Sequence, residues 1–479
     1  MTQNKKLSSS VQTNINTFKE ILPFDKSFDI LKKVVKIYDK EFHLFFIDGF
    51  AKDTNLEYVR RDILALGQEK VGNIKDAQQL VDYAISAIEA GTETDIQKLV
   101  VALLSGQTIV LFEGSDSAAL LDLRTYPTRG IDEPSNEKVL RGARDGFVET
   151  IVFNTALIRR RIRDPHLTFE MFNVGKISQT DVAIGYMSDK VDQATLNMIR
   201  DKIQTLQVDA LTITDESLVE ALNKNSWLNP LPRARYTERP DVASAQIMEG
   251  KIVLLIDNTP SAMILPVGFL DFTQDVDDFY LPVMTGNYLK LVRGLVMLMN
   301  VFLTPVYCLL INNQHWIPEW FEFIIPTDAI VVPLVIQFLI LEVSIDSLKI
   351  ASLNTPGNLG SSLSVIGGLI LGEYAVKTGW LIPHSIFYMA VVALSSFTQP
   401  SVEFGYSIKF ARILLLILVG LFGWQGLLAG VVINTVVLVS TKTLTGGSYL
   451  YPIFPFDATA LKSLLFRQPL TNKQDVNEK

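Results

Sequence analysis

Residues 354–374 read NTPGNLGSSLSVIGGLILGEY, and they lie inside an apolar block although they are poor in bulky side chains. A helix that met only lipid would be expected to carry more Leu, Ile and Phe. Small residues let helices approach closely, or they line a narrow path. The stretch therefore predicts the centre of a membrane domain. Close helix packing and the wall of a pore both fit its composition.

The chain divides into two parts of different composition. It has 479 residues, 20% of them charged, and a mean hydropathy of +0.26. That mean conceals a charged part, residues 1–285, and an apolar part, residues 289–440. The first 20 residues lack the apolar core of a signal peptide, so we expect a cytosolic N-terminal domain. The expected fold is multidomain: a cytosolic α/β domain of two related subdomains, followed by a polytopic all-α transmembrane domain.

The α/β part carries an internal repeat. SGQTIVLFEGSDSAALL from Ser105 aligns with EGKIVLLIDNTPSAMIL from Glu249. Related subdomains explain this likeness, and so do two generic strand–turn–strand units. We expect strands at 42–49, 107–112, 181–187 and 251–256, and helices at 55–66, 77–90, 93–105 and 192–206. The expected domains are a flexible lead (1–25), subdomain 1 with a linking helix (26–170), subdomain 2 (171–285), the transmembrane domain (286–442) and a cytosolic tail (443–479).

The linking helix is expected at 141–163, with Phe147, Ile151 and Ile158 on one face. Its arginines suggest a nucleic-acid or phosphate site, or a surface that is solvated or faces another subunit. The net charge is −8, and neither an aromatic stacking platform nor a Gly-rich phosphate loop accompanies the arginines. We therefore predict a subunit interface and no nucleic-acid partner. The candidate interface residues are Arg141, Arg144, Glu149, Arg159, Arg160, Arg161 and Arg163.

Apolar runs long enough to cross a bilayer of ~30 Å occur at 289–311, 330–348, 358–376 and 380–397. The run 408–441 is too long for one upright helix and is interrupted at Gly423. It predicts either a strongly tilted helix or a helical hairpin. Lys290 and Arg293 place the start of the first span in the cytosol by the positive-inside rule. Residues 271–280 are expected to form an amphipathic interfacial helix.

Polar residues in the apolar part are the candidate functional residues. Glu342, Asp346 and Lys349 fall on one helical face, where Asp346 can pair with Lys349 or Glu342 can border an ion path. Glu373 is a candidate charge at a pore mouth or a residue that reaches the membrane surface. A stripe at 3–4 spacing gives the pore-lining candidates, with Val365 as the one bulky point: Asn358, Ser361, Ser362, Val365, Gly368 and Gly372.

Enzymatic chemistry is not indicated. The sequence contains no HExxH, no GxSxG, no P-loop and no GxGxxG after a strand. The single cysteine, Cys308, excludes a disulfide framework, and the four histidines form no ligand-spaced pair. We expect no catalytic residues, no cofactor and no metal.

Several motifs together resemble the A-subunit family of bacterial spore germinant receptors. They are RGARDGFVETIVFNTALIRRRIRDPHL (141–167), YTERPDVASAQIMEGKIVLLIDNTPSAMILP (236–266), EVSIDSLKIASLNTPGNLGSSLSVIGGLILGEYAVKTGW (342–380) and YPIFPFD (451–457). Receptor A subunits usually carry an acidic residue and an arginine where this chain has Ile350 and Asn354. LKIASLNTPG together with RYTERPDV is therefore similar to a paralogous branch of the family.

The resemblance implies a multi-pass protein of the spore inner membrane that acts in germination. It implies a homo-oligomeric ring, a pentamer, that conducts ions, and a small membrane partner protein of the germination machinery. In this branch, ion release amplifies the germination response. A non-conducting scaffold that docks other germination proteins is the alternative. A transporter of a small anion ranks last, because no basic residues are expected in the centres of the predicted spans.

Overall fold

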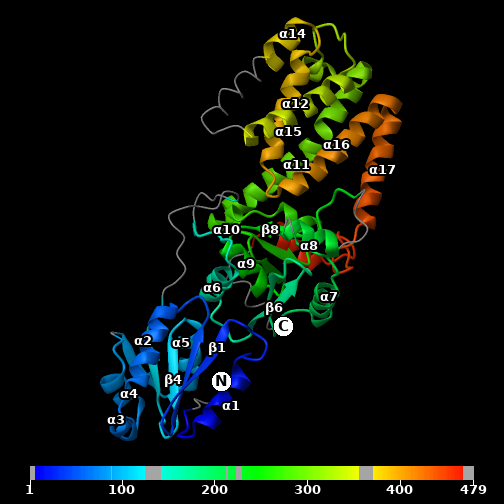
Figure 1. The fold of residues 1–479 in the computed structure, drawn as a ribbon. Helices are drawn as coiled ribbons and strands as arrows, with labels where there is room; N and C mark the ends of the chain where they lie inside the picture. Colours follow the sequence, from blue (N-terminus) through cyan, green and yellow to red (C-terminus); the bar gives the residue numbers. More distant parts are fainter. Residues whose placement is uncertain are drawn as a thin grey trace. The chain divides into compact units, whose positions relative to one another are not determined.

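The computed structural model describes residues 6–87, 89–124, 137, 142–211, 214–222, 229–354 and 370–467. The chain splits into two compact units. The first comprises Met1–Asn225 and Ala234–Val267, and it contains both β-sheets (Figure 1). The second comprises Ser226–Arg233 and Gly268–Lys479 and consists mainly of helices.

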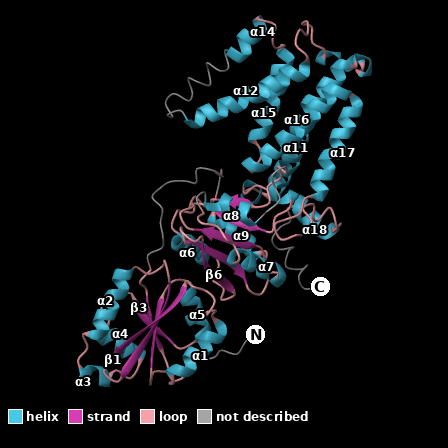
Figure 2. Cartoon of the chain, turned by 45° about the vertical axis from the view of Figure 1, so that its right-hand side comes forward, coloured by secondary structure: helices cyan, strands magenta, loops and turns pink. Residues whose placement is uncertain are grey.

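Each sheet of the first unit is antiparallel and five-stranded. The strands are drawn in magenta in Figure 2. The first sheet has the order β1-β2-β4-β5-β3, and the second has the order β6-β7-β9-β10-β8. The strands of the first are β1 (Ile30–Ile37), β2 (Lys40–Ile47), β3 (Ala90–Glu93), β4 (Thr108–Phe112) and β5 (Ala118–Leu121). Those of the second are β6 (Leu167–Val174), β7 (Thr180–Met187), β8 (Arg235–Thr237), β9 (Ile252–Ile256) and β10 (Ala262–Leu265). The two orders match position by position, which confirms the predicted internal repeat.

Equivalent helices flank equivalent strands. Helix α2 (Asp53–Leu64) follows β2, and α7 (Gln193–Gln204) follows β7. Helix α5 (Ile96–Leu104) precedes β4, and α9 (Pro240–Met248) precedes β9. Every residue of β4 and β9 is buried, as expected for central strands covered on both faces. The remaining helices of this unit are α1 (Val11–Ile21), α3 (Gln68–Asn73), α4 (Ala77–Ala84), α6 (Ile151–Arg161) and α8 (Thr214–Leu222).

The sequence-based elements of this unit need correction in several places. Six strands lie outside the predicted strand ranges: β1, β3, β5, β6, β8 and β10. In β1 and β6 the residues alternate imperfectly between buried and exposed. The predicted helix 77–90 ends at Ala84, and β3 begins at Ala90. The linking helix is shorter than predicted: α6 spans Ile151–Arg161, and the described residues 142–150 are not helical.

Helix α6 is buried on several sides and belongs to the cores of both subdomains. Ala156 packs in the core cluster of the first sheet, while α6 also contacts α9, β7 and β9 of the second. Gly49 makes this approach possible, since a Cβ there would lie 2.9 Å from the carbonyl oxygen of Val152. Its φ of +78° also favours glycine. The linking helix is therefore a shared core element.

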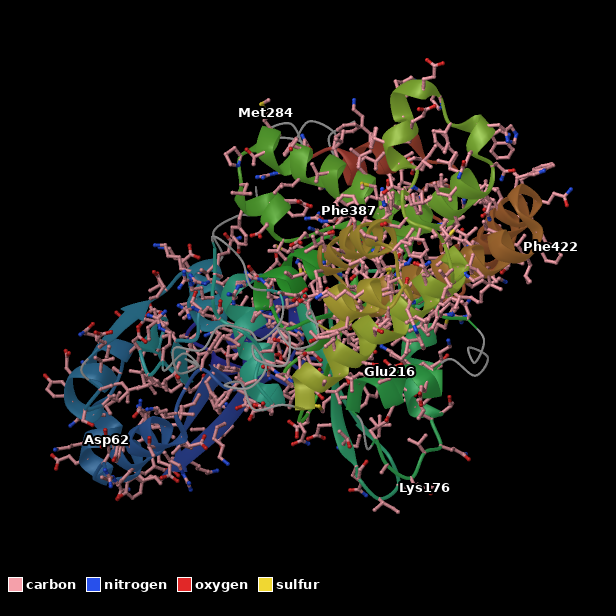
Figure 3. All side chains as sticks on the ribbon, turned by 90° about the horizontal axis from the view of Figure 1, so that it is seen from above. Asp62, Lys176, Glu216, Met284, Phe387 and Phe422 are labelled. Carbon is pink, nitrogen blue, oxygen red and sulfur yellow. The ribbon has the colours of Figure 1, made fainter. Side chains whose placement is uncertain are left out.

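The second unit is built around long apolar helices. They are α11 (Val283–Asn312), α12 (Leu334–Asn354), α15 (Pro383–Phe397), α16 (Val402–Phe422) and α17 (Trp424–Ser440). Within the described residues, α11 and α16 are long and apolar enough to cross a membrane, while α15 and α17 are apolar but shorter. Side chains such as those of Met284, Phe387 and Phe422 point outward from this unit (Figure 3). A continuous span over the predicted segment 358–376 falls largely outside the described residues.

The run 408–441 forms a helical hairpin. Gly423 separates α16 from α17 with a φ of +58°, and the two helices pack along each other. A Cβ at Gly426 would lie 1.9 Å from the carbonyl oxygen of Leu418. Asn434 Nδ2 also donates to the carbonyl oxygen of Ala411 at 3.3 Å. Of the two alternatives that the sequence left open, the structure shows the hairpin.

The segment before α11 differs from its prediction. Instead of one amphipathic helix over 271–280, a short 3₁₀ helix η1 (Phe269–Thr273) and a single turn α10 (Asp277–Tyr280) are present. Asp278 is fully buried and pairs with Arg293, 2.7 Å from Oδ2 to Nη1. A Cβ at Gly286 would lie 2.2 Å from the carbonyl oxygen of Asp278. The Asp278–Arg293 ion pair and the close approach of Gly286 to Asp278 therefore occur where one continuous helix was predicted.

Candidate functional site

The basic cluster of the linking helix contains one arginine with an internal role. Arg159 is fully buried, and its Nε lies 2.9 Å from Oδ2 of Asp29, which is 1% exposed. Nη2 donates to Asp29 Oδ1 at 3.2 Å and to the carbonyl oxygen of Leu167 at 3.0 Å. Ser27 Oγ also donates to Asp29 at 2.6 Å. Arg159 therefore joins the starts of β1 and β6, and the prediction that it faces another subunit is wrong.

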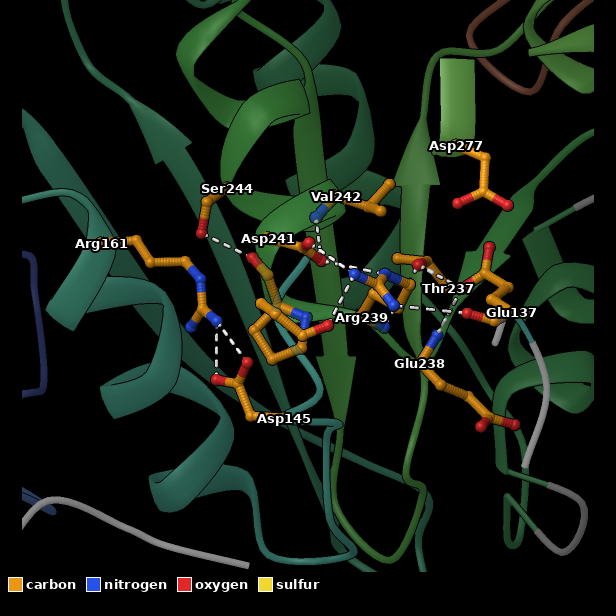
Figure 4. Close-up of polar contacts among 12 residues, drawn as sticks. Glu137, Asp145, Arg161, Thr237, Glu238, Arg239, Asp241, Val242, Ser244 and Asp277 are labelled. Atoms are coloured by element: carbon orange, nitrogen blue, oxygen red, sulfur yellow. Dashed lines mark hydrogen bonds and ion pairs between the residues drawn. The ribbon is translucent and has the colours of Figure 1, made fainter. Parts of the chain in front are cut away.

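A second buried arginine anchors the segment that leads into α6. Arg239 follows β8 and is 1% exposed. It pairs with Asp241 at 2.7 Å and donates to the carbonyl oxygens of Glu137 and Ala143 at 3.3 and 3.0 Å (Figure 4). The Glu137 carboxylate accepts from the Thr237 hydroxyl at 2.6 Å. Burial raises the pKa of Glu137 above its ordinary value. Residues 235–241, RYTERPD, thus bind Glu137 and Ala143 through Thr237 and Arg239.

The other interface candidates are distributed differently. Arg144, Glu149, Arg160 and Arg163 are exposed. Arg161 is half-buried and pairs with Asp145 through Nη2 at 2.6 Å (Figure 4). Arg141 lies outside the described residues. The role of the exposed members as an interface with another copy of the chain stays a prediction.

In the helical unit, three helices meet at a group of charged and polar side chains, of which Asn300, Glu342 and Arg412 are buried and Asp346 and Lys409 are half-buried. We define the charged layer as Asn300 on α11, Glu342 and Asp346 on α12, and Lys409 and Arg412 on α16. Arg412 Nε donates to Glu342 Oε1 at 2.6 Å, and both side chains are 3% exposed. Arg412 Nη1 donates to the main-chain and side-chain oxygens of Asn300, the former at 2.9 Å.

Lys409 completes the charged layer. Its Nζ lies 3.2 Å from Glu342 Oε2 and also pairs with Asp346. The Asp346–Lys349 pair that the sequence suggested is thus replaced by a pair between helices. Lys349 instead lies over the Phe397 ring, 4.8 Å from its centroid. Two carboxylates and two cations balance in charge, as burial requires.

The layer also holds polar atoms that lack a protein partner. Asn300 Nδ2 and Asp346 Oδ1 are buried without a hydrogen bond within the described residues, and so is Thr304 Oγ1 one turn further along α11. Buried donors and acceptors of this kind are normally satisfied by protein or water. Among the described residues, these three atoms of α11 and α12 are left without a protein partner.

The charged layer lies well inside the helices. Arg412 comes ten residues after Val402, the first residue of α16, which corresponds to about 15 Å along the axis. The expectation that basic residues are absent from the span centres is therefore wrong. The expectation was wrong because the last apolar run was taken to begin at Ile408, which places Arg412 near the edge of the run. Helix α16 begins at Val402.

The pore candidates are only partly visible. Asn358, Ser361, Ser362, Val365 and Gly368 lie outside the described residues. Gly372 lies in a π-helical turn, Ile370–Tyr374, and Glu373 in the same turn is exposed. Glu373 Oε1 lies 2.5 Å from Lys377 Nζ. Both interpretations of Glu373, and the pore-lining role of the stripe, stay predictions.

Sequence reasoning missed several residues that organise these sites. Asp29, Arg239, Asn300, Lys409 and Arg412 were not selected as site residues. For Arg412 a signal existed, since a cation within an apolar run needs an acidic partner at similar depth. Among the described residues no group of three or more His, Cys, Asp or Glu side chains could hold a metal ion.

Comparisons with known proteins agree on one family. Residues 16–478 match the family described as Bacillus/Clostridium GerA spore germination protein. Stage V sporulation protein AF of Bacillus subtilis (strain 168) is 33% identical, over 95% of this chain and 92% of that protein. Spore germination protein KA of the same organism is 28% identical, over 97% of this chain and 85% of that protein.

One solved structure is also similar. It is the crystal structure of the N-terminal domain of the A subunit of the Bacillus megaterium spore germinant receptor GerK3. The match has a TM-score of 0.43 and 21% identity, and it covers 56% of this chain and 99% of that one.

Proposed function

This chain belongs to the GerA family of spore germination proteins, and we propose that it is an oligomeric ion-channel subunit of the spore inner membrane. It would amplify the germination response by releasing monovalent cations. The family assignment and the germination proteins among the relatives support a role in germination. The conducting activity, the ring and its five copies belong to the proposal.

The distribution of basic residues supports the proposed orientation. The start of α11 and the ends of α12 and α17 carry Lys290, Arg293, Lys349 and Lys442. The connection 313–333 at the other end of α11 contains neither Lys nor Arg. Under the positive-inside rule, the end with the basic residues faces the cytosol. In the spore this side is the core, where the first unit would reside.

The charged layer is the observation that carries the proposal. Charged residues inside membrane segments are costly and are usually retained for function. Here they fix α12 to α11 and α16 through Glu342 and Arg412. Helix α12 ends at Asn354, where the stretch rich in small residues begins. A braced α12 would hold that stretch at a defined position, as a pore wall requires.

The pore would form where copies of the chain meet. We propose that Asn358, Ser361, Ser362, Gly368 and Gly372 face a shared axis. Val365 would then be the narrow point, and a ring of valines can gate by excluding water. The exposed residues Arg144, Glu149, Arg160 and Arg163 would contribute to contacts between first units. A small membrane protein of the germination machinery is the proposed additional partner.

Cryo-electron microscopy of the purified full chain tests this arrangement. We expect a closed ring in which residues 358–372 of every copy surround the axis and Val365 gives the smallest radius. A monomer, or a ring with this stretch on its lipid-facing outside, would contradict the pore and favour a non-conducting scaffold.

A further inference from the structure

The chain after α17 returns to the start of α11 and is fixed there. Arg467 exchanges two hydrogen bonds with Asn287: its N–H donates to Oδ1 at 2.7 Å, and its carbonyl accepts from Nδ2 at 3.2 Å. Arg467 Nη1 donates to the carbonyl oxygen of Asp278 at 2.8 Å. Lys290 Nζ donates to the carbonyl oxygen of Leu464 at 3.1 Å. We call residues 451–467 the tail segment.

The tail segment exposes an unusual amount of apolar surface for so few residues. Phe456 is 72% exposed and Phe454 is 65% exposed. The other exposed large apolar residues of the segment are Tyr451, Ile453, Leu465 and Phe466. Single exposed apolar residues are normal on a protein surface, but a cluster of this kind marks an interaction surface.

The position of the segment indicates what covers it. Helix α11 exposes Met284, Tyr288, Leu291, Leu295 and Leu298, which recur at spacings of three and four residues and so form one outward stripe. The tail segment is attached at Asn287 and Lys290, inside the first turns of that stripe. The end of the tail segment, residues 464–467, thus adjoins a helix face that the proposed function places in lipid.

The cations at this position point to the same partner. Lys290 Nζ lies 5.1 Å from the centre of the Phe279 ring, and the Arg467 guanidinium lies 5.9 Å from it. Aromatic rings beside Lys and Arg are typical of the headgroup level of a bilayer. Cations there attract phospholipid phosphates, while the rings enter the boundary with the acyl chains.

We propose that the tail segment is an interfacial anchor that binds the phospholipid surface of the cytosolic leaflet. Phe454, Phe456 and Phe466 insert below the headgroups, and the hydrogen bonds of Arg467 and Lys290 connect this anchor to the start of α11. The anchor fixes the depth of α11 in the bilayer. This inference rests on the proposed membrane placement and requires neither conduction nor a ring.

Spin labelling of the full chain in phospholipid vesicles tests the anchor. The native thiol, Cys308, is fully buried and is replaced in a C308A background. Single cysteines are introduced by F456C in the tail segment, L291C on the α11 stripe and Y83C on α4, where Tyr83 is 73% exposed. The vesicles contain phosphatidylglycerol and phosphatidylethanolamine. Each label is compared for collisional relaxation by oxygen, which concentrates in lipid, and by a water-soluble nickel chelate.

The anchor predicts that the ratio of oxygen to nickel accessibility at position 456 shifts toward the lipid value of position 291 and away from the aqueous value of position 83. An aqueous ratio at 456 with a lipid ratio at 291 overturns the anchor alone. Aqueous ratios at both positions overturn the membrane placement as well. Low accessibility to both reagents at 456 means that protein covers the segment, and this also overturns the proposal.

A second variant tests the rings without a label on the segment. F454S/F456S/F466S removes them but leaves the backbone hydrogen bonds of Arg467 and Lys290 in place. With the label at position 291, we expect a shift toward the aqueous value, because the anchor no longer fixes the depth of α11. An unchanged depth at 291 would show that the rings do not anchor this helix.

Discussion

Arg412 on α16 and Glu342 on α12 form an ion pair with 2.6 Å between Nε and Oε1, and each side chain is 3% exposed. Neither charge could remain in this apolar interior alone, because an unpaired buried charge is costly. The pair therefore makes the packing of α12 on α16 conditional on both residues. Replacing only one of the two residues should therefore destabilise the chain more than replacing both.

The first prediction concerns this pair. E342Q leaves Arg412 without its anionic partner, so we expect the full chain in detergent to lose about 3–5 kcal/mol of unfolding free energy. E342Q/R412Q should be less damaging than the sum of the single variants. Denaturation of the four proteins of this cycle gives the coupling energy. E319Q, at an exposed site, serves as the control, and additive losses would contradict the pairing.

The second prediction concerns the contact between the two subdomains. D29N removes the carboxylate that Arg159 binds through two hydrogen bonds, and we expect a loss of about 3–5 kcal/mol because Arg159 stays buried. R163A, at an exposed position near the end of the same helix, should change stability by less than about 0.5 kcal/mol. Thermal unfolding compares the two. Equal losses of stability in D29N and R163A would mean that the Arg159–Asp29 pair does not hold the two subdomains together.

The third prediction concerns the helical hairpin. G426A places a methyl group against the carbonyl oxygen of Leu418, so α17 must move from α16 at a cost of about 1–3 kcal/mol. At Gly294 no heavy atom lies within 4 Å of the added Cβ. G294A should therefore be neutral or stabilising by up to about 1 kcal/mol, since Ala is the better helix former. If G426A were as well tolerated as G294A, the close approach of the hairpin would be refuted.

The fourth prediction concerns pH. Burial raises the pKa of Glu137 above its ordinary value of 4.5, so the folded state binds this proton more tightly than the unfolded state. The contribution of the protonated group is present at low pH and is lost as pH rises through the raised pKa. E137Q cannot titrate. The unfolding free energy of the wild type should therefore fall relative to E137Q over that interval, and a difference independent of pH would contradict the burial of a carboxyl group.

The α/β half could be predicted from the sequence where patterns were local. The strands entering the turns after Phe112 and Ile256 stand out as apolar runs, and their likeness predicted the repeat. The edge strands β1 and β6 carry Lys, Glu and Asn among apolar residues, so neither an apolar run nor strict alternation marks them. Their pairing with β2 and β7 depends on contacts that a local pattern does not encode.

In the candidate sites, too, contacts within one helix could be predicted and contacts between distant elements could not. Spacing along one helix placed Glu342 and Asp346 together correctly, because residues four apart share a face. It suggested the wrong partner for Asp346, since Lys409 lies 63 residues away in the chain. Likewise Arg159 belongs to a basic run that looks solvated, and only the fold brings Asp29 to it. Partners from distant elements cannot be identified without the arrangement of helices and strands.

The most direct test of the central claim is potassium efflux from vesicles that contain the purified full chain. We predict a low efflux for the wild type and a faster efflux for V365A, because alanine removes the bulky point of the stripe. L291A, on the exposed stripe of α11, should leave the efflux at the wild-type rate. Efflux equal to that of protein-free vesicles for both the wild type and V365A would contradict a channel.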